Sequence, residues 1–138
     1  MRVNGNLIDL RRIRNKQLVK KNSIVFYDHG VDITVSLFVF KENDTYIAYC
    51  PSLDLSGYDY TADGACSDFE YMLTDYLNHQ LENGTLRDDL VSHGWILGDM
   101  KACEPELSDM LVTNVQLRKL VALPYSKTNF NKSCHIPS

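Results

Sequence analysis

The sequence lacks a long apolar run. No stretch approaches the roughly 20 apolar residues that cross a bilayer, which argues against a membrane span and a membrane partner. Residues 1–21 carry cations on both sides of their few apolar residues, so they do not look like a secretory signal. We therefore expect a cytoplasmic protein.

The sequence also lacks the paired motifs of metal and catalytic sites. Its four cysteines form no Cys-x-x-Cys pair, and no histidine stands at zinc-ligand spacing, so we expect buried or inert thiols. No nucleophile elbow or metalloprotease motif surrounds any of the four histidines, and the seven glycines form no phosphate loop. The prediction is a non-enzymatic protein with no catalytic residue, no metal and no cofactor.

Charge is present but unevenly distributed over the 138 residues. Residues 1–21 hold seven lysines and arginines against Asp9, a balance of +6, so the rest of the chain sums to −10. An acidic body favours encounter with a basic partner, whereas a basic arm can contact nucleic acid or an acidic surface, or remain a solvated leader. The candidate nucleic-acid contacts are Arg11, Arg12, Arg14, Lys20 and Lys21.

Alternation of apolar and polar residues predicts three main strands. Residues 31–40 place five aliphatic side chains on one face, and Phe38 and Phe40 on the other, where another element must cover them. Residues 45–50 complete a hairpin, and residues 53–60 form a shorter third strand with Gly57 at a bulge or close approach. A further strand is expected at residues 23–27.

A long amphipathic helix follows the third strand. Thr61 is the expected N-cap, and Asn83-Gly84 the expected end. The apolar stripe of this helix comprises Ala65, Phe69, Met72, Leu73, Tyr76, Leu77 and Leu81.

The C-terminal part gives weaker patterns. We expect a short helix from Thr85, a strand at residues 95–97, one helix after Ser108 and a tail strand at residues 130–137. The predicted fold is α+β, a three-stranded antiparallel sheet plus a packed helix in the order β-β-β-α-β, with a helical C-terminal extension. The predicted organisation is a basic leader (1–22), an α+β domain (23–103) and a C-terminal helix and tail (104–138).

Aromatic and acidic residues gather on the second and third of these strands. Exposed aromatics on a sheet can stack bases or anchor a protein partner, and the acidic surroundings favour protein. The alternative is that the rings pack under the helix or against a C-terminal element. The candidate partner-binding residues are Tyr46, Tyr49, Tyr58, Tyr60, Asp54 and Asp59.

The run FKENDTYIAYCPSLDLSGYDYTADGACSDFEYMLTDYLNHQL resembles the HicB antitoxins. The resemblance implies a partial ribonuclease-H-like fold without nuclease activity, which binds and neutralises a small basic mRNA-cleaving toxin. It also implies an oligomer, with a dimer expected, and operator DNA as a second partner. Asp59 and Gly64 depart from the pattern, and a glycine in the first helical turn costs about 1 kcal/mol. The matching positions are Tyr46, Ala48, Pro51, Leu53, Gly57, Thr61, Ala65 and Phe69.

Two other functions stay open from the sequence. One is a nucleic-acid-binding transcriptional regulator that uses the basic leader and the C-terminal helix. The other is a residual metal-dependent nuclease that uses Asp54 or Asp59 with Glu70.

Overall fold

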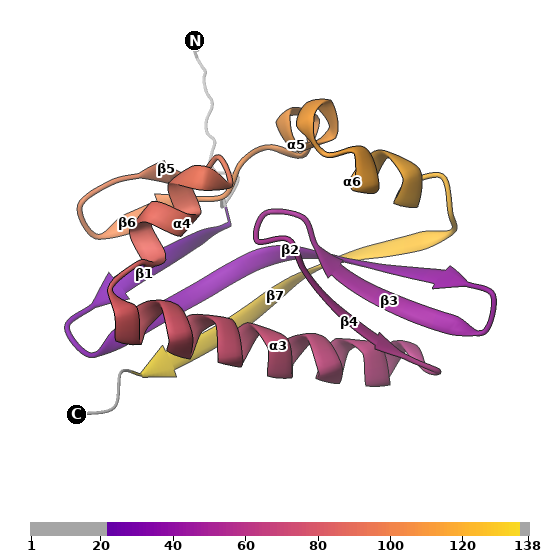
Figure 1. Ribbon diagram of the computed structural model, residues 1–138, viewed down its shortest axis with the longest axis horizontal. Helices are drawn as coiled ribbons and strands as arrows, with labels where there is room; N and C mark the ends of the chain where they lie inside the picture. The colour runs from indigo at the N-terminus through magenta and orange to yellow at the C-terminus, as the bar shows by residue number, and fades with distance from the viewer. Residues whose placement is uncertain (1–21, 136–138) are drawn as a thin grey trace, which may run out of the picture.

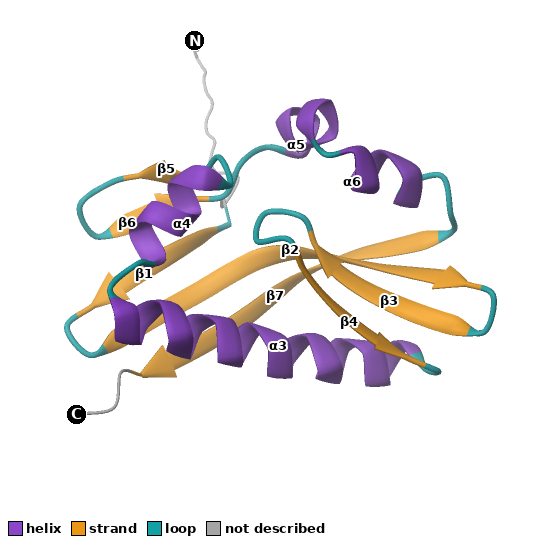
Figure 2. Ribbon diagram, viewed as in Figure 1, coloured by secondary structure: helices purple, strands orange, loops and turns teal. Residues whose placement is uncertain are grey.

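The computed structural model describes residues 22–135, which form an α+β fold with a long helix packed on an antiparallel sheet (Figures 1 and 2). The predicted α+β class is confirmed, but the predicted three-stranded sheet is wrong, because the sheet has more strands. Within the described residues it has seven strands, six of them in the order β4-β3-β2-β1-β6-β5, with β7 also paired to β2.

The N-terminal strands follow the sequence pattern closely. The predicted strands at 23–27, 31–40 and 45–50 are confirmed, whereas the next one is shorter than expected because residues 51–54 form a turn. Three residues of this turn are buried, and Asp54 has a left-handed backbone with φ 55°. The four strands are β1 (Ser23–Tyr27), β2 (Gly30–Glu42), β3 (Thr45–Cys50) and β4 (Leu55–Asp59).

Helix α3 (Ala62–Asn83) begins and ends as predicted. The Thr61 hydroxyl accepts a hydrogen bond from the Gly64 backbone N–H at 2.9 Å, and Gly84 ends the helix at φ 66°. Gly57 is a close approach between β4 and α3, because a Cβ there would stand 2.3 Å from the Phe69 backbone nitrogen. The missing side chain lets helix and strand pack together.

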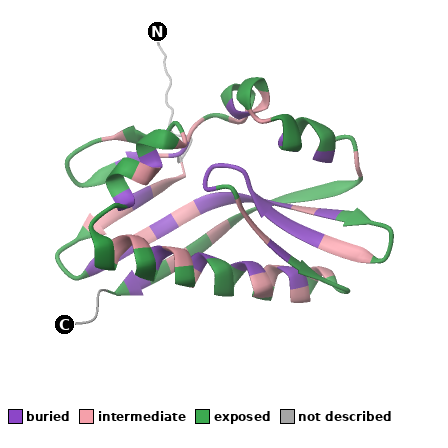
Figure 3. Ribbon diagram, viewed as in Figure 1, coloured by how far each residue is buried: buried purple, intermediate pink, exposed green. Residues whose placement is uncertain are grey.

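The sheet buries a core on each face (Figure 3). Val31, Ile33, Val35 and Leu37 join the α3 stripe in one core, as the alternation predicts. Met72 is the exception in the predicted stripe, because it is 39% exposed and lies outside this core. Phe38 and Phe40 lie in a second core, and the element that covers them is the pair of C-terminal helices. The residues that close this second core from those helices are Met110, Leu117 and Leu120.

The C-terminal part departs from the expectations. Where one helix after Ser108 was expected, two helices meet at Asn114, whose side chain accepts from the Leu117 N–H and starts the second helix. Ser108 is not the cap, because the first helix already begins at Leu107. The elements after α3 are α4 (Leu86–Ser92), β5 (Ile96–Leu97), β6 (Lys101–Cys103), α5 (Leu107–Thr113), α6 (Val115–Leu120) and β7 (Tyr125–His135).

Strand β7 is longer than the tail strand expected at residues 130–137. It pairs with β2 from Gly30↔His135 to Phe40↔Tyr125, so the C-terminal segment belongs to the same sheet as the N-terminal strands. The predicted strand at residues 95–97 is present as β5, and it pairs with β6 at the far edge of the sheet.

The other edge of β2 is shared between two strands. Residues 30–33 of β2 pair with β1 and residues 38–42 with β3, so residues 34–37 have no strand beside them on that edge. The carboxylate of Glu104, which is 5% exposed, fills this fork. It accepts hydrogen bonds from the Ser36 N–H (3.0 Å), the Ser36 hydroxyl (2.9 Å), the Ser52 hydroxyl (2.5 Å) and the Asn22 amide (3.1 Å).

No helix within residues 22–135 has both the length and the apolar character needed to cross a membrane.

Substitution of Gly57 tests the close approach of β4 and α3. We expect Gly57→Ala to lower the free energy of unfolding by about 3 kcal/mol, because the backbone contacts cannot yield without separating helix from strand. A Cβ at Gly84 would meet open space, and the left-handed backbone there is the only unfavourable feature for alanine. Gly84→Ala should therefore lower the free energy of unfolding by about 1 kcal/mol. Urea denaturation of both variants compares them, and equal losses would contradict the close approach.

Substitution of Glu104 tests the fork. Glu104→Gln places an amide N–H₂ among groups that donate hydrogen bonds, so we expect a loss of at least about 2 kcal/mol in the free energy of unfolding. Glu82→Gln, the same change at an exposed position on α3, is the matched control and should be neutral. A Glu104→Gln variant as stable as the control would show that the carboxylate is not needed.

Candidate functional site

The four candidate tyrosines do not form one cluster. Tyr46 faces α3, where its ring lies 5.6 Å from the Lys41 ammonium, and Tyr49 is buried on the opposite face in the second core. Tyr58 and Tyr60, at the end of β4, are 57% and 80% exposed. Of the four tyrosines, only these two have most of the side chain exposed to solvent.

Carboxylates surround the two exposed tyrosines. Asp59 lies between them in sequence, and the first turns of α3 add Asp63 and Asp68. We call these five residues, Tyr58, Asp59, Tyr60, Asp63 and Asp68, the β4 patch. The Asp68 carboxylate accepts a hydrogen bond from the Tyr58 backbone N–H at 2.9 Å. This bond occupies a donor at the edge of the sheet, so the patch offers side chains rather than a free strand edge at this point.

The two departures from the HicB pattern are structurally coupled. A Cβ on Gly64 would stand 1.7 Å from the Asp59 carboxylate, so the aspartate fills the space that the glycine leaves. The same carboxylate accepts from the Thr61 hydroxyl at 3.2 Å, and the Thr61 hydroxyl in turn caps α3. Asp59 thus supports the helix start that Gly64 was expected to weaken.

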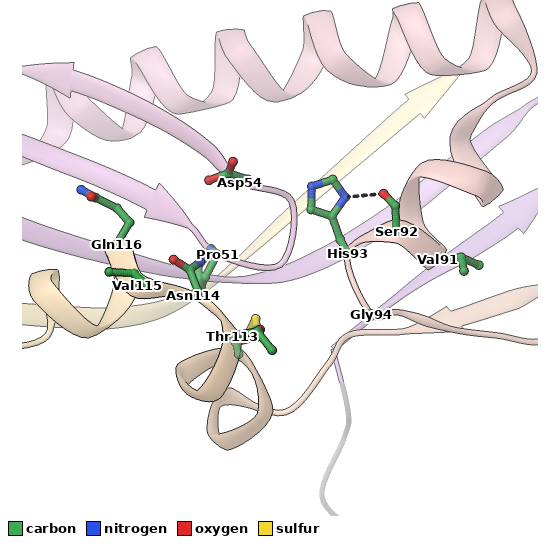
Figure 4. A pocket seen from close by; sticks show the side chains of 11 residues that line it. Pro51, Asp54, Val91, Ser92, His93, Gly94, Thr113, Asn114, Val115 and Gln116 are labelled. Atoms are coloured by element: carbon green, nitrogen blue, oxygen red, sulfur yellow. Dashed lines mark hydrogen bonds between the residues drawn. The ribbon is translucent and has the colours of Figure 1, made fainter.

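A cleft lies beyond the other end of β4, between the end of α4, the 51–54 turn and helices α5 and α6 (Figure 4). Its volume is about 600 Å³, and a smaller hollow of about 220 Å³ adjoins it through shared residues that include His93 and Met110. In Figure 4, Asp54 lines the cleft from the 51–54 turn and His93 lines it from the end of α4. We call the two hollows together the α4–α5 cleft.

Asp54 is held at this cleft by a short chain of hydrogen bonds. The Tyr49 hydroxyl donates to the Asp54 carboxylate at 2.9 Å and accepts from the Asn114 amide, also at 2.9 Å. Burial raises the pKa of Tyr49 to about 12, and the neighbouring carboxylate adds to the rise. Tyr49 therefore remains a neutral donor at physiological pH and positions Asp54 rather than contacting a partner itself.

His93 caps the end of α4. Its Nδ1 lies 2.9 Å from the Asp89 carbonyl oxygen and 3.5 Å from the Asp89 carboxylate. The Ser92 hydroxyl donates to the same carbonyl oxygen at 2.6 Å. The Ser92 and His93 side chains are thus both engaged with the end of α4.

The carboxylates considered for a metal-dependent nuclease are not gathered. Asp54 precedes β4 and Asp59 ends it. The Glu70 carboxylate forms an ion pair with the Lys132 ammonium group, with 2.8 Å between Oε2 and Nζ. Across the part of the chain that the structure describes, no three His, Cys, Asp or Glu side chains are placed to hold a metal ion.

The sequence did not point to the cleft, because its walls come from three segments far apart in the chain. Val91, His93 and Asn114 carried no motif that would have joined them to Asp54. Arg11, Arg12, Arg14, Lys20 and Lys21 lie outside the described residues.

Comparisons of the chain with protein-family models, with curated proteins and with solved structures gave no significant match.

The buried thiol of Cys50 gives a test of the core around these sites. Burial raises the pKa of the Cys50 thiol to about 12, and the nearby Glu104 carboxylate raises it further. At about pH 8 it stays a thiol and should resist iodoacetamide in the native protein, whereas the partly exposed Cys103 should react. Mass spectrometry of the alkylated chain measures both, with denatured protein as control. Equal native rates would contradict the burial of Cys50.

Proposed function

We propose that the protein is a non-enzymatic binding protein, a HicB-like antitoxin that binds and neutralises a small basic toxin that cleaves mRNA. The observation that carries the proposal is the β4 patch, where Tyr58 and Tyr60 stand 57% and 80% exposed among three carboxylates. Tyrosine is enriched among the residues that dominate binding energy at protein interfaces. Carboxylates beside it select a partner that carries lysines and arginines.

Net charge supports a basic partner. The chain after residue 21 sums to −10, and three of its carboxylates lie in the β4 patch. A field of this sign accelerates association with a cationic protein and repels nucleic acid. The acidic body therefore favours a protein partner over RNA stacking on the same tyrosines.

The succession of elements supports the HicB-like assignment. Strands β2, β3 and β4 are joined in sequence as antiparallel neighbours, and α3 packs on them directly afterwards. The resemblance implies this order of three strands and a helix. Four positions of the resemblance are structural in this chain. Thr61 caps α3, Gly57 lets α3 approach β4, and Ala65 and Phe69 are buried on the face of α3 that packs on the sheet.

The test is complex formation with the small basic protein encoded beside this chain. Co-purification should give a complex, and co-expression should relieve the toxicity of that protein. In the complex, we expect Tyr58→Ala and Tyr60→Ala each to raise Kd about 30-fold, because each removes a solvent-facing aromatic anchor worth about 2 kcal/mol.

Tyr71→Ala provides the matched control, since Tyr71 is 71% exposed on α3 and outside the β4 patch. Its Kd should equal that of the unmodified chain. Absence of any complex would refute the antitoxin proposal. A complex that Tyr71→Ala weakens as much as the β4 variants would refute the role of the β4 patch.

A further inference from the structure

Acidic residues line the α4–α5 cleft, among them Asp54, Glu104 and Asp109. No lysine or arginine of residues 22–135 is among its lining residues. The Glu104 carboxylate is already occupied in the fork of the sheet. Asp54 gives one oxygen to Tyr49 and lies at an exposed position on the cleft wall, so it is the carboxylate best placed for a ligand.

Apolar side chains frame the same cleft. Val91 and Val115 line its larger part and Ile96 its smaller part, and all three are more than half exposed. Met110 lies in the wall common to both parts. An aliphatic rim around a carboxylate suits a side chain with an apolar stem and a cationic head, which describes arginine and lysine.

The chain enters the described structure beside this cleft. Asn22 accepts a backbone hydrogen bond from the Glu104 N–H at 2.9 Å, and its amide donates to the Glu104 carboxylate. Glu104 itself lines the smaller part of the cleft. Residues 1–21 are therefore tethered next to an acidic, apolar-rimmed hollow.

The tethered segment has the matching chemistry. Residues 1–21 have a balance of +6, and residues 10–14 read Leu-Arg-Arg-Ile-Arg, so two aliphatic side chains stand among three arginines there. A span of this length reaches up to about 70 Å, so chain length does not limit access. Tethering also gives such a segment an effective concentration on the order of millimolar at a nearby site.

We propose that residues 1–21 dock in cis in the α4–α5 cleft, with a guanidinium from the 11–14 run against the Asp54 carboxylate. The leader thereby neutralises part of the acidic body and covers the exposed valines. This interaction does not depend on the proposed antitoxin function, because it needs no second protein and lies at the opposite end of β4 from the β4 patch.

Hydrogen exchange measured by mass spectrometry on the full chain tests the proposal. In the triple variant Arg11→Gln, Arg12→Gln, Arg14→Gln, we expect amides of residues 91–94 and 107–116 to exchange at least about fivefold faster than in the unmodified chain. Asp54→Asn should reproduce the change, and about 1 M salt should abolish the difference between the chains. Amides of residues 69–83 on α3 serve as the internal reference and should not change.

The matched control removes the same number of cations from the other part of the leader. Lys16→Gln, Lys20→Gln, Lys21→Gln should leave the cleft amides protected. The proposal is overturned if neither triple variant changes the cleft amides, if both change them equally, or if the change falls on α3. Because Asp54→Asn could also loosen the Tyr49 contact, Asp109→Asn supplies a second cleft variant, and its cleft amides should also exchange faster.

Measurements at several protein concentrations distinguish the leader of the same chain from a second copy as the occupant of the cleft. Docking in cis requires protection that is independent of dilution, so protection that falls on dilution would assign the cleft to a second copy and overturn the proposal. A DNA duplex added to the full chain gives the remaining contrast. Two results together would assign the leader to nucleic acid instead. The DNA binding would be sensitive to salt and would require Arg11, Arg12 and Arg14, and the arginine variant would leave the exchange of the cleft amides unchanged.

Discussion

The rest of the structure depends on the fork in the sheet that the Glu104 carboxylate closes. Strand β2 must pair with β1 at one end and with β3 at the other, and a backbone N–H left unpaired in a buried gap is costly. Glu104 supplies the missing acceptors, and through Ser52 it also holds the turn that leads into β4. The Trp95 indole N–H donates to the Ser52 carbonyl oxygen at 2.7 Å, so the same turn is secured from the α4 side.

That anchoring fixes the position of β4. The two candidate surfaces, the α4–α5 cleft and the β4 patch, lie at opposite ends of this strand. The turn before the strand sets Asp54 on the wall of the α4–α5 cleft, with Tyr49 and Asn114 behind it. The end of the strand presents the β4 patch, while Gly57 keeps α3 close beneath. The Glu104 carboxylate thus holds the turn that leads into β4, and both surfaces lie at the ends of that strand. The two surfaces share an acidic character, and the proposals assign them to different cationic partners, one in trans and one in cis.

Sequence periodicity predicted the strands and helices whose contacts are local. It did not predict the parts of the structure that depend on contacts between segments far apart in the chain. The alternation over residues 31–40 placed the aliphatic and aromatic side chains on the correct faces, and the helix caps at Thr61 and Gly84 were legible because each acts within one turn. The fork in the sheet could not be predicted from the sequence. Nothing around Glu104 in the sequence indicates that its carboxylate accepts hydrogen bonds from Ser36, which lies 68 residues earlier in the chain. The candidate site was half predicted: Tyr58 and Tyr60 are exposed, but Tyr49 is buried because α5 and α6 cover its face.

The central claim is that this fold presents a tyrosine and carboxylate surface at the end of β4 to a basic protein. The most direct measurement is an amide chemical-shift map of the isotope-labelled full chain, titrated with the small basic protein encoded beside it. The account predicts that the largest shifts fall on residues 55–63, with β7 unaffected. Shifts concentrated on β7, or none on residues 55–63 at saturating partner, would contradict it.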